Sequence, residues 1–516
     1  MMTADGFFRS RRELRIDFRH PLAARFFSFL PTCLSFARAL GASGLLALSA
    51  CAPLASLPDP AARVSGIVTP EAWRQRAQAE RLAAKGGETQ SLATWWTAFG
   101  DPQLETLIQR ALASAPDRRL AEARLRQARA QRNLAHADYW PTLSASARAS
   151  RSPGSSDDDT HYQAGFDASW EMDIFGRVRH SAAAASADLA AAREHLAQAE
   201  VTLAAEIARE YIGYRVLQAR HAIAQRNAQN QVELLEIARW RAASGLVSDL
   251  DVENARILLA QTEASLPSLV SERASALHRL DVLLGLAPGS LEETLAAPQP
   301  LPTPPEKIAI GIPAETLARR PDVRAAEASL RAERARAYAQ GAERFPALTL
   351  SGSFGWQALT SAALGSHESI VRSLMAALTA NLFDGGRLKN RIAMQDAVLE
   401  EALVRYEQSL ITALKEVEEA LAAHAAGEAR QGLYTKALEA ARNATTLSEQ
   451  MYQAGMGDFQ SVLESQRSLL TAEENRIGAE SDTLLALIML YKALGGGWAY
   501  EAPAAPSPSL STESSS

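Results

Sequence analysis

The chain has 516 residues and a formal net charge of −6 at pH 7, and 47% of its residues are hydrophobic but only 6% are aromatic. The acidic balance argues against nucleic acid as a partner, because phosphate contacts need clustered Lys and Arg. The sequence contains no HExxH, G-x-S-x-G or phosphate-loop motif, and its nine His are scattered. We therefore expect no catalytic residue, no metal site and no cofactor.

Residues 1–50 are typical of a secretory signal peptide of the lipoprotein type. Seven Arg and three acidic residues precede a short apolar run, Ala39–Leu48, which is too short to span a membrane. The following Leu48-Ser49-Ala50-Cys51 resembles a bacterial lipobox, which implies cleavage before Cys51 and attachment of lipid to it. By resemblance to known lipoproteins, Ala52 in place of Asp favours sorting to the outer membrane. The alternative is an ordinary signal peptide with an incidental Cys. The mature chain then has 46 basic and 56 acidic residues, and no cysteine is left for a disulfide or a metal.

Two stretches of equal length, Gly176–Gly245 and Gly386–Gly455, predict long helices. At 1.5 Å per residue, each makes a rod of about 100 Å. Charged residues occur throughout both rods, so they stand in water rather than in lipid. In the second rod, apolar residues recur at alternating spacings of four and three, which is the seam of a coiled coil. This seam comprises Leu399, Leu403, Tyr406, Leu410, Ala413, Val417 and Ala420.

The two rods belong to an internal duplication. Pro116 and Pro321 are 205 residues apart, as are Pro141 and Pro346, whereas the glycines that flank the rods recur at a spacing of 210. The first repeat is expected over 103–284, with a helix at about 103–138, strands 142–151 and 162–174, a long helix 177–243 and a helix 248–284. The second repeat is expected over 313–498, with a helix 313–343, strands 347–357 and 371–383, a long helix 387–453 and a helix 458–494. The remaining segments are an irregular lipid-anchored arm 51–102, a Pro-rich connector 285–312 and a disordered tail 499–516.

The four strand segments alternate with period two, as transmembrane β-strands do. In the second segment, Tyr162, Ala164, Phe166, Ala168, Trp170 and Met172 alternate with polar residues or glycine. Four strands cannot close a barrel, and an open edge in lipid leaves backbone groups unpaired. The chain must therefore oligomerise through its sheet. A dimer would close eight strands and a trimer twelve, and only the trimer leaves an aqueous lumen comparable with a ring of twelve helices.

Several motifs occur in register over residues 90–498. They are Trp95-Trp96-x-x-Phe99-x-Asp101-Pro102-x-Leu104, Trp170-Glu171-x-Asp173-x-Phe175-Gly176-Arg177, Phe383-Asp384-Gly385-Gly386-Arg387, Tyr452-Gln453-Ala454-Gly455 and Ala493-Leu494-Gly495-Gly496-Gly497-Trp498. Together they resemble the TolC-like outer membrane factors, which are outer-membrane efflux lipoproteins of the NodT type.

The resemblance implies a mixed α and β membrane protein that forms a homotrimer. Its long coiled-coil helices form an α-barrel, and four strands per chain contribute to a 12-stranded transmembrane β-barrel. The implied function is the outer-membrane exit channel of a tripartite efflux system, a passive duct across the periplasm and the outer membrane. The implied partners are outer-membrane lipid, a periplasmic membrane-fusion adaptor and an inner-membrane pump of the RND or a similar kind, which open the channel at its periplasmic tip.

The resemblance also implies where the gate lies. Glu464 and Leu463 match the constriction just after the second glycine turn, and Ser461 matches a second position there. Three copies of Glu464 near a symmetry axis would repel one another and attract cations. The alternative is an ordinary solvated carboxylate on a helix surface.

Polar links between the repeats are expected at the tip. By the resemblance, Tyr452 and Asp251 match partners in such links. Gly457 lies at a position where some members of the family carry Arg. The turns at Gly245, Gly455 and Gly457 are the expected contact for the adaptor. Simple capping of helix hairpins by Gly and Asp is an equal alternative for these residues.

A second function remains open from the sequence alone. A lipid-anchored periplasmic coiled-coil protein without a pore, structural or adaptor in role, would account for the rods and for Cys51. It leaves unexplained the four amphipathic strands at matched places in the two repeats.

Overall fold

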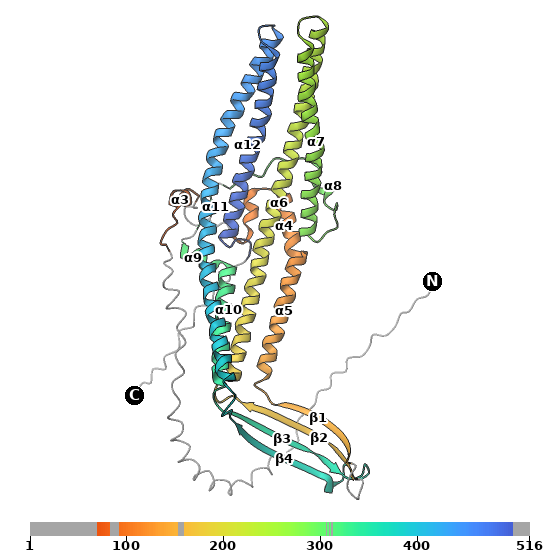
Figure 1. Ribbon diagram of the computed structural model, residues 1–516, viewed down its shortest axis with the longest axis vertical. Helices are drawn as coiled ribbons and strands as arrows, with labels where there is room; N and C mark the ends of the chain where they lie inside the picture. The colour runs from red at the N-terminus through yellow and green to blue at the C-terminus, as the bar shows by residue number, and fades with distance from the viewer. Residues whose placement is uncertain are drawn as a thin grey trace, which may run out of the picture. The chain divides into compact units, whose positions relative to one another are not determined.

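Long helices lie above a four-stranded sheet in the structural unit formed by residues 60–516 (Figure 1). The computed structural model describes residues 70–82, 92–152, 159–305, 307–308, 310 and 313–498. The expected signal peptide, the lipid site at Cys51 and the tail from residue 499 lie outside the described residues.

The two rods are continuous helices, α6 (Arg177–Ala243) and α11 (Arg387–Gln453), of 67 residues each. Both start after a left-handed glycine, and an aspartate caps each start. Asp173 accepts hydrogen bonds from the amides of Val178 and Arg179, and Asp384 accepts three from the start of α11. These backbone hydrogen bonds lower the pKa of Asp384. The apolar seam of α11 is buried except for the half-buried Tyr406, as a packed coiled-coil helix requires.

Each rod packs against helices that run back along it. These are α7 (Asp249–Leu283) and α5 (Pro116–Ala137) beside α6, and α12 (Phe459–Ala493) and α10 (Pro321–Ala342) beside α11, with α10 also against α6. The single helices expected over 103–138 and 313–343 are wrong, because the short helices α4 (Pro102–Ser114) and α9 (Pro313–Arg319) are separate. A new helix begins at each proline, which lacks the N–H that a continuous helix needs but suits a first helical position.

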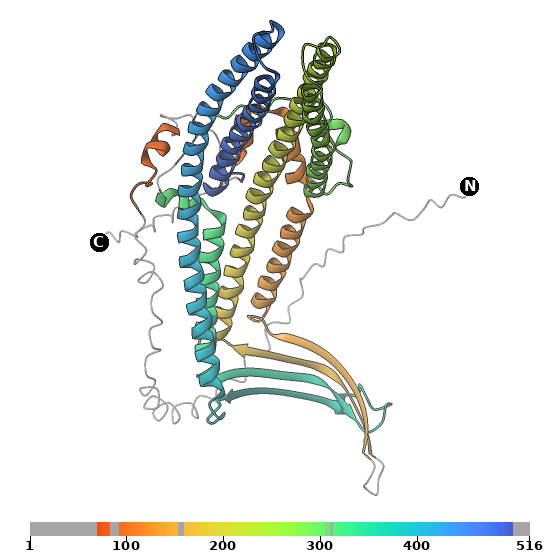
Figure 2. The ribbon, with the colours of Figure 1, turned by 45° about the horizontal axis from the view of Figure 1, so that its top comes forward.

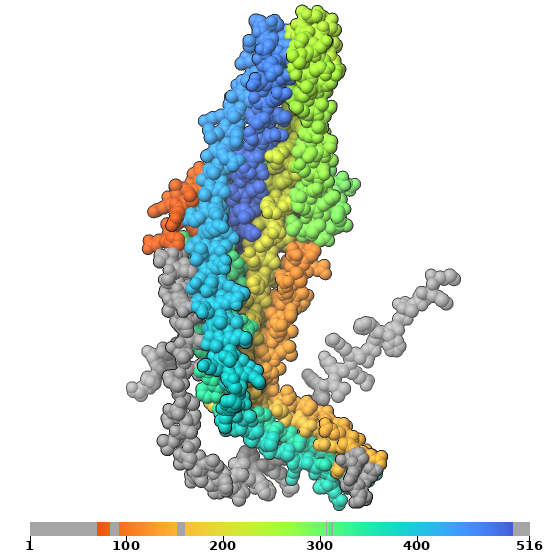
Figure 3. Space-filling model, in the orientation of Figure 1, coloured from red at the N-terminus to blue at the C-terminus, as the bar shows by residue number. Residues whose placement is uncertain are grey.

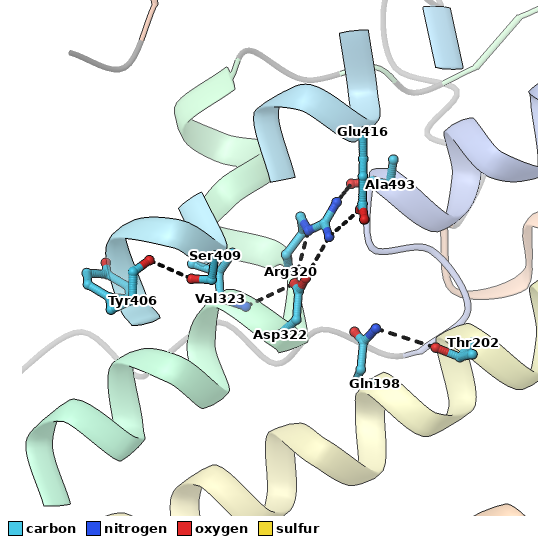
Figure 4. Close-up of polar contacts among 9 residues, drawn as sticks. All are labelled: Gln198, Thr202, Arg320, Asp322, Val323, Tyr406, Ser409, Glu416 and Ala493. Atoms are coloured by element: carbon cyan, nitrogen blue, oxygen red, sulfur yellow. Dashed lines mark hydrogen bonds and ion pairs between the residues drawn. The ribbon is translucent and has the colours of Figure 1, made fainter. Parts of the chain in front are cut away.

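The shorter helices therefore stack end to end in two lines: α7 on α5, and α12 on α10. A Cβ atom on Gly285, just past the end of α7, would lie 2.8 Å from the Pro116 ring at the start of α5. At the equivalent junction of α12 and α10, Arg320 donates to the Ala493 carbonyl at 2.9 Å (Figure 4). The Arg320 guanidinium is buried and also pairs with Asp322 and Glu416, so it ties α10, α11 and α12 together.

The arm expected to be irregular contains ordered structure, namely α3 (Arg76–Leu82) and the 3-10 helix η2 (Leu92–Phe99), and the connector holds α8 (Glu292–Leu295). Trp95 and Trp96 are buried, and the Trp95 ring stacks on Tyr491 of α12 at 5.0 Å. The Gly497 amide donates to the Leu92 carbonyl at 2.8 Å. The arm is ordered because its aromatic residues fill a space that distant parts of the chain create.

A second buried arginine, Arg215 of α6, joins the start of α4 to the connector. It donates to the Tyr211 hydroxyl, to Gln103, to Gln218 and to the Ala297 carbonyl. The Tyr211 hydroxyl in turn donates to the Asp101 carboxylate at 2.6 Å.

The sheet has the antiparallel order β1 (Thr142–Ser152), β2 (Asp159–Met172), β3 (Ala347–Ala358) and β4 (Ile370–Thr379). Figure 2 shows its strands curving away from the helices. β4 ends at Thr379 and not at residue 383, because Thr379 pairs with Ala347, the first residue of β3 after Pro346. Leu382 and Phe383 therefore lie beyond the ladder, and both are exposed.

The register gives the sheet one apolar face and one polar face. Phe166 pairs with Ala145 and Phe354, whereas the next residue, Asp167, pairs with Ser144 and Ser353. The apolar face is exposed at Leu143, Phe354, Leu374 and Leu378, among others. Among the described residues, no helix is both long enough and apolar enough to cross a membrane.

Candidate functional site

The two hairpin tips, at the end of the unit away from the sheet, are built by the same local structure. Gly245 and Gly455 adopt left-handed φ values of 67° and 73°. After α6, the Leu246 amide donates to the Arg241 carbonyl, and after α11 the Met456 amide donates to the Met451 carbonyl, each at 2.9 Å. These are Schellman motifs, in which glycine avoids the steric penalty of a left-handed residue. Figure 3 shows the two tips side by side.

A small apolar core joins the two hairpins just below the turns. It contains Leu234, Leu235, Ala238, Val252, Ala255, Leu258, Tyr452, Phe459, Val462 and Leu463. Leu463 is only 1% exposed. The expectation that Leu463 lines a gate is therefore wrong for this chain, because its side chain is enclosed by both hairpins. Its role is to position the turn of α12 that carries Glu464.

Polar contacts between α11 and α12 fix the orientation of the turn of α12 that carries Glu464. The Ser448 and Ser465 hydroxyls are 2.7 Å apart, and Gln466 donates to Glu449 at 2.5 Å. Because these side chains and Leu463 point toward α11 and α6, Glu464 is exposed. It lines an open groove of about 580 Å³ between α11 and α12, together with Arg467.

Ser461, the second expected gate residue, is also exposed. Its backbone amide donates to Asp458, the N-cap of α12, at 2.7 Å. This hydrogen bond lowers the pKa of Asp458, so the carboxylate keeps its charge at the tip. Glu464, Ser461 and Asp458 thus lie within the first two turns of one helix.

A polar link between the repeats is present, but its partners differ from those expected. Arg241 of α6 donates to the Tyr452 carbonyl at 2.6 Å and to the Gln453 carbonyl at 3.3 Å. Its guanidinium lies 4.4 Å from the centre of the Tyr452 ring. Arg241 therefore caps the C-terminus of α11, where a cation is favoured by the exposed carbonyls and the helix dipole.

Asp251 does not take part in this link. It lies in the first turn of α7, and no side-chain hydrogen bond between Asp251 and Tyr452 occurs among the described residues. The Tyr452 hydroxyl is buried without a hydrogen-bond partner in the described part of the chain. A larger side chain at Gly457 would be in tight contact with α11, since a Cβ atom there would lie 3.1 Å from Met451 Cβ.

Arg241 is a residue that sequence reasoning missed. The position 210 residues later is Met451, so the duplication itself gives no sign of a paired cation. One signal was available, which is an arginine in the last turn of a long helix, close to a partner helix that ends at the same level.

The tips also expose large apolar side chains. Trp240, Leu246, Leu250 and Met456 are each about two-thirds exposed or more. Exposed apolar groups that cluster on a water-facing surface mark an interaction site. No group of acidic, His or Cys side chains suited to a metal ion occurs in the described ranges.

Comparison with known proteins agrees with this architecture. The family model described as "Outer membrane efflux protein" matches residues 107–286 and 312–496. The pyoverdine export outer membrane protein OpmQ of Pseudomonas aeruginosa is 33% identical over 469 residues, which cover 88% of this chain and 96% of OpmQ. The solved outer-membrane channel OprN has a TM-score of 0.78 and 34% identity, covering 83% of this chain and 98% of OprN. The outer membrane protein VceC of Vibrio cholerae has a TM-score of 0.74 and 26% identity, covering 79% of this chain and 99% of VceC.

The extent of these matches confirms the resemblance expected from the motifs and excludes an enzyme. It also accounts for the four strands, which the pore-less coiled-coil alternative left unexplained. The duplicated helical hairpins, the four-stranded sheet and these similarities lead to one conclusion: the chain belongs to the outer membrane efflux protein family and is an outer-membrane channel of an efflux pump.

Proposed function

We propose that three copies of this chain form one continuous duct, with a 12-stranded barrel in the outer membrane and a twelve-helix tunnel in the periplasm. The observation that carries this proposal is the four-stranded sheet with one apolar and one polar face. Its edge strands β1 and β4 pair on one side only within the described chain. Unpaired edges are not tolerated in lipid, so neighbouring copies must satisfy them.

The polar faces of the strands then line water in the barrel, and the two hairpins of each copy continue the wall toward the tips. The tips form the periplasmic end of the duct, which is its gate. Glu464 lies on the exposed side of α12, and three copies of it around the axis make an acidic constriction, with Ser461 one turn closer to the tip. Carboxylate rings of this kind favour cations and disfavour anions.

In the resting duct, the Arg241 link holds the second hairpin of each copy against the first. The link expected between Tyr452 and Asp251 is thus made by Tyr452 and Arg241 instead. It requires no arginine at position 457. Opening requires the α11–α12 hairpin to move relative to α6, which breaks the two hydrogen bonds of Arg241.

The partners are a periplasmic membrane-fusion adaptor and an inner-membrane pump, which together with this channel make a tripartite system. The adaptor docks on the turns at Gly245, Gly455 and Gly457. Trp240, Leu246, Leu250 and Met456 support this contact, because they offer an adaptor exposed apolar surface at those turns. A lipid on Cys51 anchors the arm to the outer membrane.

The assembly is tested by native mass spectrometry of the full-length protein released from detergent micelles. We expect a particle of three chains, each carrying the mass of a lipid that the Cys51→Ala variant lacks. A particle of two chains would contradict the twelve-stranded barrel, and a soluble monomer of Cys51→Ala would contradict an integral sheet.

A further inference from the structure

Two arginines interrupt the apolar face of the sheet. Arg372 of β4 pairs with Phe354, so it lies on the same face as Phe166 and Leu374, and Arg151 of β1 also lies on this face. The described positions of the face carry no Asp or Glu. The only charges on the described part of the apolar face are therefore positive.

Both arginines lie toward the same end of the sheet. Arg372 is two residues after the start of β4, and Arg151 is one residue before the end of β1. These strand ends lie at the end of the sheet that is away from the helices (Figure 1). Because the water-exposed helices extend from the opposite end, the arginines belong to the external side of the membrane.

Arg372 is exposed and surrounded by apolar side chains. Ile370 and Leu374 precede and follow it on the same face of β4, with exposures of 38% and 80%, and Phe354 beside it is 47% exposed. Within the described part of the chain, Arg372 makes no side-chain hydrogen bond or ion pair. Its guanidinium thus has unused donors on a surface that otherwise suits acyl chains.

A charge on the lipid face is unfavourable in the middle of a bilayer and is tolerated near the interface. Arg372 is about 7 Å along the strand from Ile370, the first residue of β4. Its apolar stem can remain in the acyl region while the guanidinium reaches the headgroup level. At that level, phosphate is the group that a planar guanidinium binds best, through two parallel hydrogen bonds.

We propose that Arg372, Phe354, Ile370 and Leu374 form a binding site for an anionic, phosphate-bearing lipid of the external leaflet. The guanidinium binds the phosphate, and the three apolar side chains contact the acyl chains. A lipid fits this site better than free phosphate does, because the apolar side chains offer nothing to an inorganic ion. The inference rests on the place of the sheet in the outer membrane and is independent of the proposed gate.

The test uses the full-length protein in neutral detergent micelles, titrated with diphosphorylated lipid A and observed by native mass spectrometry. Arg372→Gln is the test variant. Arg148→Gln is the matched control, because Arg148 is also exposed, but on the polar face of the same sheet, where it pairs with Gln163. We expect the affinity for lipid A to fall about tenfold in Arg372→Gln, which corresponds to one charge-assisted hydrogen-bonded pair. We expect no change in Arg148→Gln.

Arg372→Lys keeps the charge but loses the planar fork, so it should bind lipid A with intermediate affinity. The same spectra report the mass of the assembly, so that each variant is compared in its intact form. The proposal is overturned if Arg372→Gln binds as the wild type does, or if Arg148→Gln loses as much affinity. It is also overturned if inorganic phosphate at the lipid concentration displaces lipid A.

Discussion

Replacing Arg241 by alanine should favour the open state of the channel. The variant removes the hydrogen bonds to the Tyr452 and Gln453 carbonyls and the stacking on the Tyr452 ring. It leaves the Schellman turns and the apolar tip core intact, because neither uses the Arg241 side chain. The hairpins therefore keep their own structure and lose the link that joins them.

The size of the effect follows from the geometry. A hydrogen bond from a charged donor contributes about 1.5–3 kcal/mol, and a cation–π contact at an exposed site about 0.5–1 kcal/mol. Arg241 is half-buried, and the Tyr452 carbonyl also accepts the Gly455 amide at 3.0 Å, so it is not left without a donor. We therefore expect a loss of about 2 kcal/mol per chain, which changes the ratio of open to closed tips about thirtyfold.

Single-channel recording in planar bilayers measures this ratio as open probability and mean conductance. Arg241→Lys should be intermediate, since it keeps the charge but neither the fork nor the stacking. Arg239→Ala is the control, because Arg239 is exposed on the same turn and has no side-chain partner among the described residues. If Arg241→Ala forms intact assemblies with the open probability of the wild type, the link does not hold the tip closed.

Two further predictions concern stability. Arg215→Met should lower the stability of the assembly by about 3 kcal/mol or more, because it leaves buried hydrogen-bond partners in α4 and the connector unpaired. Arg209→Ala removes an exposed arginine whose partner Glu210 keeps its ion pair with Arg279, so it should cost less than about 1 kcal/mol. Equal melting temperatures of the two variants would refute the role of Arg215. Burial, and secondarily Arg81, lowers the pKa of His424, which contacts Gln78 of α3 at 2.9 Å. When α3 is not docked, His424 can bind a proton at its ordinary pKa. Docking of α3 should therefore be strongest above about pH 6.5 and weaken as the pH falls below it. Hydrogen exchange of residues 76–82, corrected for intrinsic rates, should show this loss in the wild type and not in His424→Gln.

Local periodicity predicted most of the architecture. The heptad seam of α11 and the period-two strands are signals within one segment, and the duplication repeated them at a fixed spacing. The predicted length of β4 is too great because apolar alternation continues to Leu382, whereas the hydrogen-bond ladder ends where its partner β3 begins. A strand's length depends on its neighbour, which the segment itself does not encode.

The candidate site was less predictable because its contacts join distant parts of the chain. Arg241 and Tyr452 are 211 residues apart, and no local pattern connects them. Leu463 and Glu464 are neighbours with opposite surroundings, and their environments are set by α6 and α11 rather than by their own sequence. The arm was misjudged for the same reason, since Trp95 is ordered by Tyr491 of α12.

The central claim, a duct with an acidic constriction at its tip, is tested most directly by the reversal potential of single channels in a KCl gradient. The wild type should be cation-selective, and Glu464→Gln should lose most of this selectivity. Glu474→Gln is the matched control, because it removes the same charge from an exposed position of α12 that does not line the groove of Glu464. Selectivity that is unchanged in Glu464→Gln, or lost equally in Glu474→Gln, would contradict the placement of the constriction, and the absence of any conductance would contradict the duct itself.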